Sequence, residues 1–253
     1  MEKTKQVKNR LELLDVIRGI TLISMILYHT MFDVTLYTRE GLGWYLGTPG
    51  YIWQQAICWS FIFLSGMCRA IGKKSLKRGL IVSGCGLIIT LVTWIFMPSE
   101  RIIFGVLTFT GAAMLFVCPF EKLFRKINPY VGMGISAVLF FVTRNVYFYH
   151  GLGFEGIKLC RLPDFLYANY VTAFFGFPQK SFFSGDYFPF LPWIFLFLAG
   201  YFFWLCFGEK IRNLKVMHFD IPFFSFMGRH SLLIYMLHQP IAYGLVYLIF
   251  MVF

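Results

Sequence analysis

The stretch RGITLISMILYHTMFD, residues 18–33, lies within an apolar run and decides the fold class. A helix needs about 20 apolar residues to cross the hydrocarbon core of a bilayer, which is about 30 Å thick, and this run is long enough. It nevertheless carries Arg18, His29 and Asp33, with Asp15 just upstream. Ionisable side chains are costly in hydrocarbon and mark functional sites when a span retains them. The stretch therefore predicts a membrane span with a polar stripe.

Composition extends this prediction to the whole chain. The 253 residues are 58% hydrophobic, 21% aromatic and 14% charged, and their mean hydropathy is +0.67. A soluble domain does not need so many apolar residues in long runs. We predict an all-α polytopic membrane protein with about seven transmembrane helices, which form a single domain over residues 1–253. The expected spans are 13–36, 51–71, 80–97, 102–120, 129–149, 190–207 and 230–252.

The net charge of +11 is explained by membrane topology. Four basic clusters, which begin at Lys3, Lys73, Lys122 and Lys210, occupy alternate connections between the spans. Because basic residues concentrate in cytoplasmic loops, the N-terminus is expected inside and the C-terminus outside, in the plasma membrane. The dispersed charge and the lack of a recognisable module predict no nucleic-acid partner. The first apolar run is too long for a signal peptide and lacks a cleavage site, so we expect it to remain as a span.

Two further features bear on the architecture. The outer connection at 150–189 is long and contains PDFLYANYVTAFFGFP, which predicts an interfacial or re-entrant helix. The cysteines have no CxxC or Cys/His ligand spacing, so we interpret them as packing residues and expect no disulfide and no metal site. These cysteines are Cys58, Cys68, Cys85, Cys118, Cys160 and Cys206.

The polar residues of the first span share one face. Arg18 and His29 are eleven residues apart, which at 100° per residue returns to within about 20° of the same direction, and about 16 Å further along the axis. Asp15 and Asp33 lie on that face too. The stripe is therefore expected to face the protein interior or a wet cavity. Asp15 with Arg18 fits an interfacial ion pair as well as a functional one, and His29 with Asp33 fits either packing or catalysis, with catalysis favoured.

The last span repeats the pattern in GRHSLLIYMLHQP, residues 228–240. Arg229, His230 and Ser231 stand where the helix is expected to begin, and Ser231, Tyr235 and His238 share one face. His238 lies about 13 Å above Arg229, close to the depth predicted for His29. The two histidines can line one cavity if the first and last spans are neighbours. Packing of His238 against Tyr235 and Gln239 is the alternative.

This layout suits a ligand with a phosphorylated head and a long thin arm. Arginine side chains and the backbone N–H groups of a helix N-terminus bind phosphate, and neutral imidazole can accept a proton from a hydroxyl or an amine. Coenzyme A has the required shape. The residues expected to bind acetyl-CoA as co-substrate are Asp15, Arg18, Arg69, Lys73, Arg229, His230, Ser231 and Tyr235.

Three longer stretches carry a family resemblance. RGITLISMILYH fits an Arg-x10-His pattern of membrane acyltransferases, and FIFLSG, GDYFPFLPWIFLFLAG (185–200) and GRHSLLIYMLHQP follow in order. Together they resemble the bacterial relatives of the heparan-α-glucosaminide N-acetyltransferase catalytic domain, within a wider transmembrane acyltransferase superfamily. The resemblance covers the chain from about Arg10 to Phe253, which makes the single domain an acyltransferase domain. The lysosomal enzyme has its key histidine in the loop after the first span, whereas residues 37–50 here contain none.

The resemblance implies acetyl transfer from cytosolic acetyl-CoA to a glycan or small sugar acceptor presented outside. We predict His29 as general base, with Asp33 orienting the ring and His238 as the third catalytic residue. Asp186 and Gln239 are the expected acceptor-binding residues. A transporter or flippase for a small solute or lipid-linked sugar, using the same buried polar cavity, is the alternative function. The acceptor, N- or O-acetylation, an acetyl-histidine intermediate and the choice between monomer and homodimer stay open.

Overall fold

The structure is a computed structural model that describes residues 10–38, 42–72 and 75–252. Helices dominate these residues, and their sheet is a single two-stranded hairpin. A helix forms at each of the seven predicted spans, so the chain is an all-α polytopic membrane protein. The long helices are α2 (Glu12–Tyr37), α4 (Thr48–Ile71), α5 (Ser75–Phe96), α6 (Val106–Phe124), α7 (Pro129–Thr143), α10 (Phe190–Arg212) and α12 (Ser231–Val252).

Six helices in the described ranges are long and apolar enough to cross a bilayer. Helix α4 is outside this set although it has 24 residues. Gln54, Gln55 and Arg69 lower its mean hydropathy. The sequence segment 129–149 also divides, because α7 ends at Thr143 and the short helix α8 (Val146–Tyr149) follows.

The long connection at 150–189 contains more structure than one helix. Strands β1 (Gly151–Phe154) and β2 (Ile157–Arg161) form an antiparallel hairpin that the sequence analysis did not predict. The 3-10 turn η2 (Asp164–Leu166) follows, and then the six-residue helix α9 (Tyr170–Phe175). Six residues rise only about 9 Å, so α9 fits an interfacial segment better than a re-entrant one.

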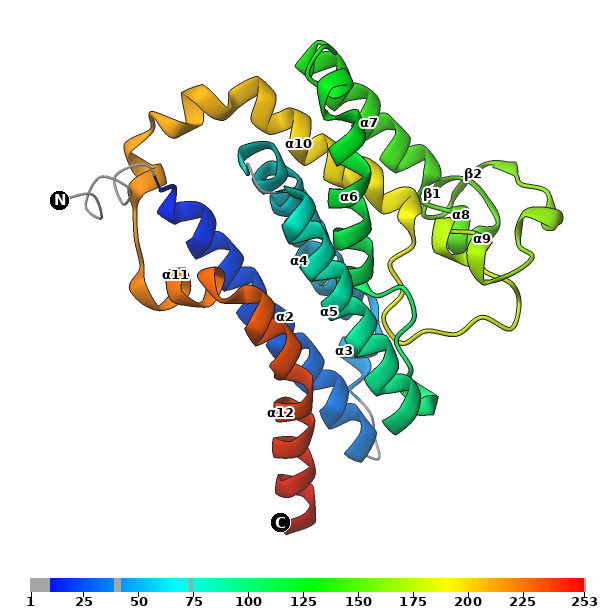
Figure 1. Ribbon diagram of the computed structural model, residues 1–253. Coiled ribbons are helices and arrows are strands. Elements are labelled where there is room, and N and C mark those ends of the chain that lie inside the picture. Colours follow the sequence, from blue (N-terminus) through cyan, green and yellow to red (C-terminus); the bar gives the residue numbers. More distant parts are fainter. Residues whose placement is uncertain (1–9, 39–41, 73–74, 253) are drawn as a thin grey trace. The chain divides into compact units, whose positions relative to one another are not determined.

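The chain divides into two compact units. The first comprises Met1–Phe61 and Phe207–Phe253 and holds α2, the short helix α3 (Gly43–Leu46), the first half of α4, the 3-10 turn η3 (Lys215–His218), α11 (Pro222–Arg229) and α12. In this unit α11 and α12 both pack against α2 (Figure 1). The histidines of the first and last spans therefore belong to one unit.

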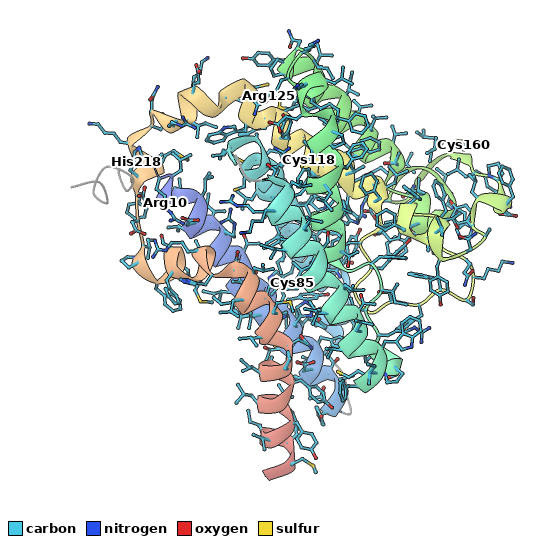
Figure 2. All side chains as sticks on the ribbon, in the orientation of Figure 1. Arg10, Cys85, Cys118, Arg125, Cys160 and His218 are labelled. Atoms are coloured by element: carbon cyan, nitrogen blue, oxygen red, sulfur yellow. The ribbon has the colours of Figure 1, made fainter. Side chains whose placement is uncertain are left out.

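The second unit, Ile62–Cys206, contains the rest of α4, α5, the 3-10 turn η1 (Pro98–Glu100), α6 to α9 and most of α10. Its helices approach closely through glycines: a Cβ on Gly66 would lie 1.9 Å from the carbonyl oxygen of Phe197, and one on Gly200 2.1 Å from that of Phe63. Small residues at helix crossings are typical of membrane bundles. The described cysteines form no disulfide, and Cys160 is exposed on β2, whereas Cys85 and Cys118 lie on α5 and α6 (Figure 2).

Candidate functional site

Two glycines set the spacing of α2 and α11. A Cβ on Gly19 would lie 2.0 Å from the carbonyl oxygen of Phe224, and a Cβ on Gly228 would lie 1.9 Å from that of Asp15. Only glycine, which has no Cβ, allows two helices to approach this closely, so the two backbones are in direct contact. The contact fixes where α12 starts relative to α2, because α11 ends at Arg229 and α12 begins two residues later.

Beyond this contact, α2 and α12 bring the two predicted histidines together. The ring centroids of His29 and His238 are 5.2 Å apart. His29 is half-buried, and His238 is 8% exposed. The Nδ1 atom of His238 lies 2.6 Å from the carbonyl oxygen of Tyr235. A carbonyl only accepts, so Nδ1 carries the hydrogen and the Nε2 atom of the neutral ring presents a lone pair.

One turn further along α2, Asp33 meets α12. Its carboxylate is 1% exposed and accepts a hydrogen bond at 3.0 Å from Nε2 of Gln239. Sequence reasoning expected Asp33 to orient His29, but within the described residues the bond from Gln239 is the one hydrogen bond of this carboxylate. The predicted acceptor residue Gln239 thus lies beside the predicted catalytic residues.

His29, Asp33, His238 and Gln239 form a cluster that has more hydrogen-bond acceptors than donors. Three of the buried side-chain atoms that have no hydrogen-bond partner within the described residues belong to this cluster: Oδ2 of Asp33, Oε1 of Gln239 and Nε2 of His238. Each is an acceptor, because the Gln239 amide nitrogen and the His238 Nδ1 hydrogen are already used. Buried acceptors without donors are costly. The cluster is therefore suited to a ligand that offers several donors.

The start of α2 carries the ion pairs that the sequence left open as structural or functional. Asp15 contacts Arg10 Nε at 2.7 Å and Arg18 Nη1 at 3.2 Å. Arg18 also donates to the carbonyl oxygen of Gly228 at 3.4 Å. At the same end, the Nδ1 atom of His218 lies 3.1 Å from the carbonyl oxygen of Arg10 (Figure 2).

The junction of α11 and α12 differs from the sequence expectation. Arg229 ends α11 instead of opening the last span, His230 lies between the helices, and Ser231 begins α12. Arg229 and His230 are exposed, and His230 Nδ1 lies 2.9 Å from the carbonyl oxygen of Phe226. Tyr235 is buried, with its ring centroid 5.2 Å from that of His238. Arg229 and Ser231 are thus separated by a helix break.

Three other predicted site residues lie elsewhere. Arg69 belongs to the second unit, where its side chain is 1% exposed and pairs with Glu121 at 2.8 Å. Asp186, in the same unit, accepts at 3.4 Å from the backbone N–H of Val106 and so caps α6. Lys73 lies outside the described residues. Glu121 is a polar partner that sequence reasoning missed, although its place near the end of an apolar run marked it.

Sequence reasoning also passed over an aromatic group next to His29. Tyr28 precedes this histidine, and its ring centroid lies 4.8 Å from that of Tyr45 and 5.3 Å from that of Trp53. The aromatic-rich segment GWYL at 43–46 was the available signal. In so aromatic a chain that signal does not stand out.

Comparison with known proteins identifies the family of the chain. No match was found among curated proteins or among solved structures. The family model described as heparan-alpha-glucosaminide N-acetyltransferase, catalytic, matches residues 10–240, which is most of the chain and includes all the cluster residues on α2 and α12. This confirms the predicted resemblance and with it a multi-pass acyltransferase family. The chain belongs to the family of the heparan-α-glucosaminide N-acetyltransferase catalytic domain.

Proposed function

We propose that the chain transfers an acetyl group from acetyl-CoA to an amino group of a sugar-like acceptor at the cluster of His29, Asp33, His238 and Gln239. The observation that carries this proposal is the set of three buried acceptor atoms without partners. A hydroxyl has one hydrogen to donate, whereas an ammonium has three. The carboxylate of Asp33 also balances the positive charge of the ammonium. The cluster therefore favours an amine over an alcohol.

An ammonium must lose a proton before its nitrogen can attack. The bare Nε2 of His238 can accept this proton, and His29, whose ring centroid is 5.2 Å away, is the base that the sequence predicts. The amine nitrogen then bonds to the thioester carbonyl carbon and the carbon–sulfur bond breaks. The thiolate leaves and takes up the second proton, which the nitrogen gives up as the amide forms. Direct transfer needs one such attack, whereas an acetyl-histidine intermediate needs two.

Acetyl-CoA is proposed to enter from the end of α2 that carries Arg18. The phosphates are assigned to Arg18 and Arg229 and to the backbone N–H groups at the start of α12. The arm then follows α2 for about 16 Å to His29, the rise of eleven helical residues. Arg69 belongs to the second unit and Lys73 lies outside the described residues, so neither is part of this proposal.

The decisive test pairs turnover with binding. We expect purified wild-type protein to bind coenzyme A with micromolar affinity by calorimetry, and to acetylate an amino sugar with radiolabelled acetyl-CoA. His29→Ala and His238→Gln are each expected to abolish transfer while binding of coenzyme A persists. Full activity in either variant would remove that histidine from the mechanism.

The binding site for the phosphates needs its own control. Arg18→Ala and Arg229→Ala are expected to weaken coenzyme A binding about tenfold each, since one charge-assisted contact is lost. Arg212→Ala, at the exposed end of α10 in the same unit, should leave the affinity unchanged. Absence of any coenzyme A binding, together with sugar uptake into proteoliposomes, would favour the transporter.

A further inference from the structure

A row of aromatic rings leads away from the histidines in the first unit. It consists of Tyr28 on α2, Tyr45 and Trp44 on α3, and Trp53 on α4, and we call it the aromatic row. The centroid of Tyr28 lies 6.0 Å from the His29 ring, 4.8 Å from Tyr45 and 5.3 Å from Trp53. Trp53 and Trp44 follow, with centroids 6.2 Å apart and ring planes inclined by 21°.

The row is held by the backbone and by polar contacts. The indole Nε1 of Trp53 donates to Ser24 Oγ at 2.8 Å, which ties the start of α4 to α2. A Cβ on Gly50 would lie 1.7 Å from the carbonyl oxygen of Tyr45, so α3 sits directly on the backbone of α4. These contacts set the ring positions before any ligand arrives.

The side chains of the aromatic row become more exposed toward Trp44. Tyr45 is 4% exposed, Tyr28 and Trp53 are half-buried, and Trp44 at the far end is 48% exposed. Burial raises the pKa of Tyr45, and its hydroxyl shares a side-chain hydrogen bond with Tyr28. The row thus joins an exposed ring to the histidine cluster by consecutive ring contacts.

Aromatic rings in a polar site suit a ring-shaped ligand with one apolar face. The C–H bonds of a pyranose point to its two faces, where they pack on an aromatic ring, while its hydroxyls point outward to hydrogen-bonding groups. A tryptophan at the membrane interface is the competing explanation for Trp44. An interfacial anchor does not require Trp53 and Tyr28 to extend the contacts inward to His29.

We infer that the aromatic row is the subsite that binds the sugar ring of the acceptor, with Trp44 as the outermost stacking surface. This inference rests on the proposed function, because it takes the amine at the histidines to be carried by a sugar. It adds that selection between a sugar amine and a simple amine resides in α3 and the start of α4, and not in the histidine cluster.

The kinetic test compares two acceptors. We expect Trp44→Ala to raise KM for a glucosamine disaccharide about tenfold and to leave kcat and the KM for acetyl-CoA unchanged, since only ring stacking is lost. Trp44→Phe, which retains a smaller ring, should recover part of the loss. The KM for 2-aminoethanol, which has no ring, should not move. Trp94→Ala is the control, because Trp94 is 54% exposed on α5, outside this unit.

A binding measurement separates this inference from the proposed chemistry. Calorimetry with the glucosamine disaccharide alone, without acetyl-CoA, is expected to show binding to wild type and to Trp94→Ala and about tenfold weaker binding to Trp44→Ala. This pattern supports the subsite even if acetyl transfer fails. No binding to wild type, or equal binding to Trp44→Ala and Trp94→Ala, overturns the subsite even if acetyl transfer succeeds.

Discussion

Replacing Gly19 by alanine tests the helix contact that positions the candidate site. The added Cβ would lie 2.0 Å from the carbonyl oxygen of Phe224, whereas ordinary contact begins at 3.4 Å. Both sides of the contact are helix backbone, so no change of rotamer relieves the overlap. The helices α2 and α11 must therefore separate by about 1.4 Å at this point.

The cost follows from the packing that such a gap removes. A radial gap of about 0.5–1 Å already forfeits a quarter to a half of the dispersion attraction between facing atoms. Overpacking a close contact costs about 1–3 kcal/mol, and a backbone overlap belongs at the upper end, so we expect about 3 kcal/mol for Gly19→Ala. In a chain of this size each kcal/mol lowers Tm by about 2–4 °C, which gives a fall of about 6–12 °C.

The assay is thermal unfolding in detergent, followed by the fraction of protein that elutes as a single species. Gly244→Ala is the matched control, because Gly244 lies on α12 in the same unit and its Cβ would meet nothing within 4 Å. Alanine favours helix over glycine by about 1 kcal/mol, so this variant should melt at or slightly above the wild-type temperature. If Gly19→Ala melted together with Gly244→Ala, the direct backbone contact would be refuted.

Three further variants address other contacts. Asp33→Asn should lower kcat about 10- to 100-fold, with coenzyme A affinity unchanged in calorimetry, because a charged acceptor becomes neutral. Arg69→Gln should lower the free energy of unfolding by about 3 kcal/mol and Arg125→Gln by less than about 1 kcal/mol in parallel melts, since both pair with Glu121 but the first is buried and the second 49% exposed. Burial raises the pKa of Tyr167 to about 12, so its contribution to stability should be retained up to about pH 10 and lost as pH rises toward 12; melts of Tyr167→Phe should show a smaller loss over this range.

The sequence predicted the spans and the polar faces well because both follow from short-range periodicity. His29 and His238 were assigned similar depths by counting helical rise, and their rings do meet. That they meet depends on α2 packing against α12, which is a contact between residues more than 200 positions apart. Apolar patterns show which face of a helix avoids lipid, but not which helix covers that face.

The missed features have local causes. Helix α11 was missed because its eight residues are too few to span a bilayer, so Arg229 was assigned to the start of the last span and not to the end of a separate helix. The bond between Asp33 and Gln239 was missed because an i, i+4 neighbour, His29, offered a simpler partner on the same helix. The hairpin at 151–161 was missed because its strands are only four and five residues long and β2 is exposed throughout.

The contacts between the first and last spans also bear on whether α4 crosses the membrane. The pairs His29 with His238, Asp33 with Gln239, and Tyr37 with Tyr243 advance together along α2 and α12. The two helices therefore run in the same direction.

Helices that cross a bilayer in succession alternate in direction, so an odd number of spans must separate two parallel ones. Along the sequence, four candidate spans separate α2 from α12: α5, α6, α7 and α10. Helix α4 is the remaining long helix in this interval, and counting it makes the number odd. The parity is satisfied if α4 crosses the membrane as well, despite Gln54, Gln55 and Arg69. Its polar residues are tolerated because they have protein partners: Gln55 accepts from Trp59 at 3.0 Å and Arg69 pairs with Glu121.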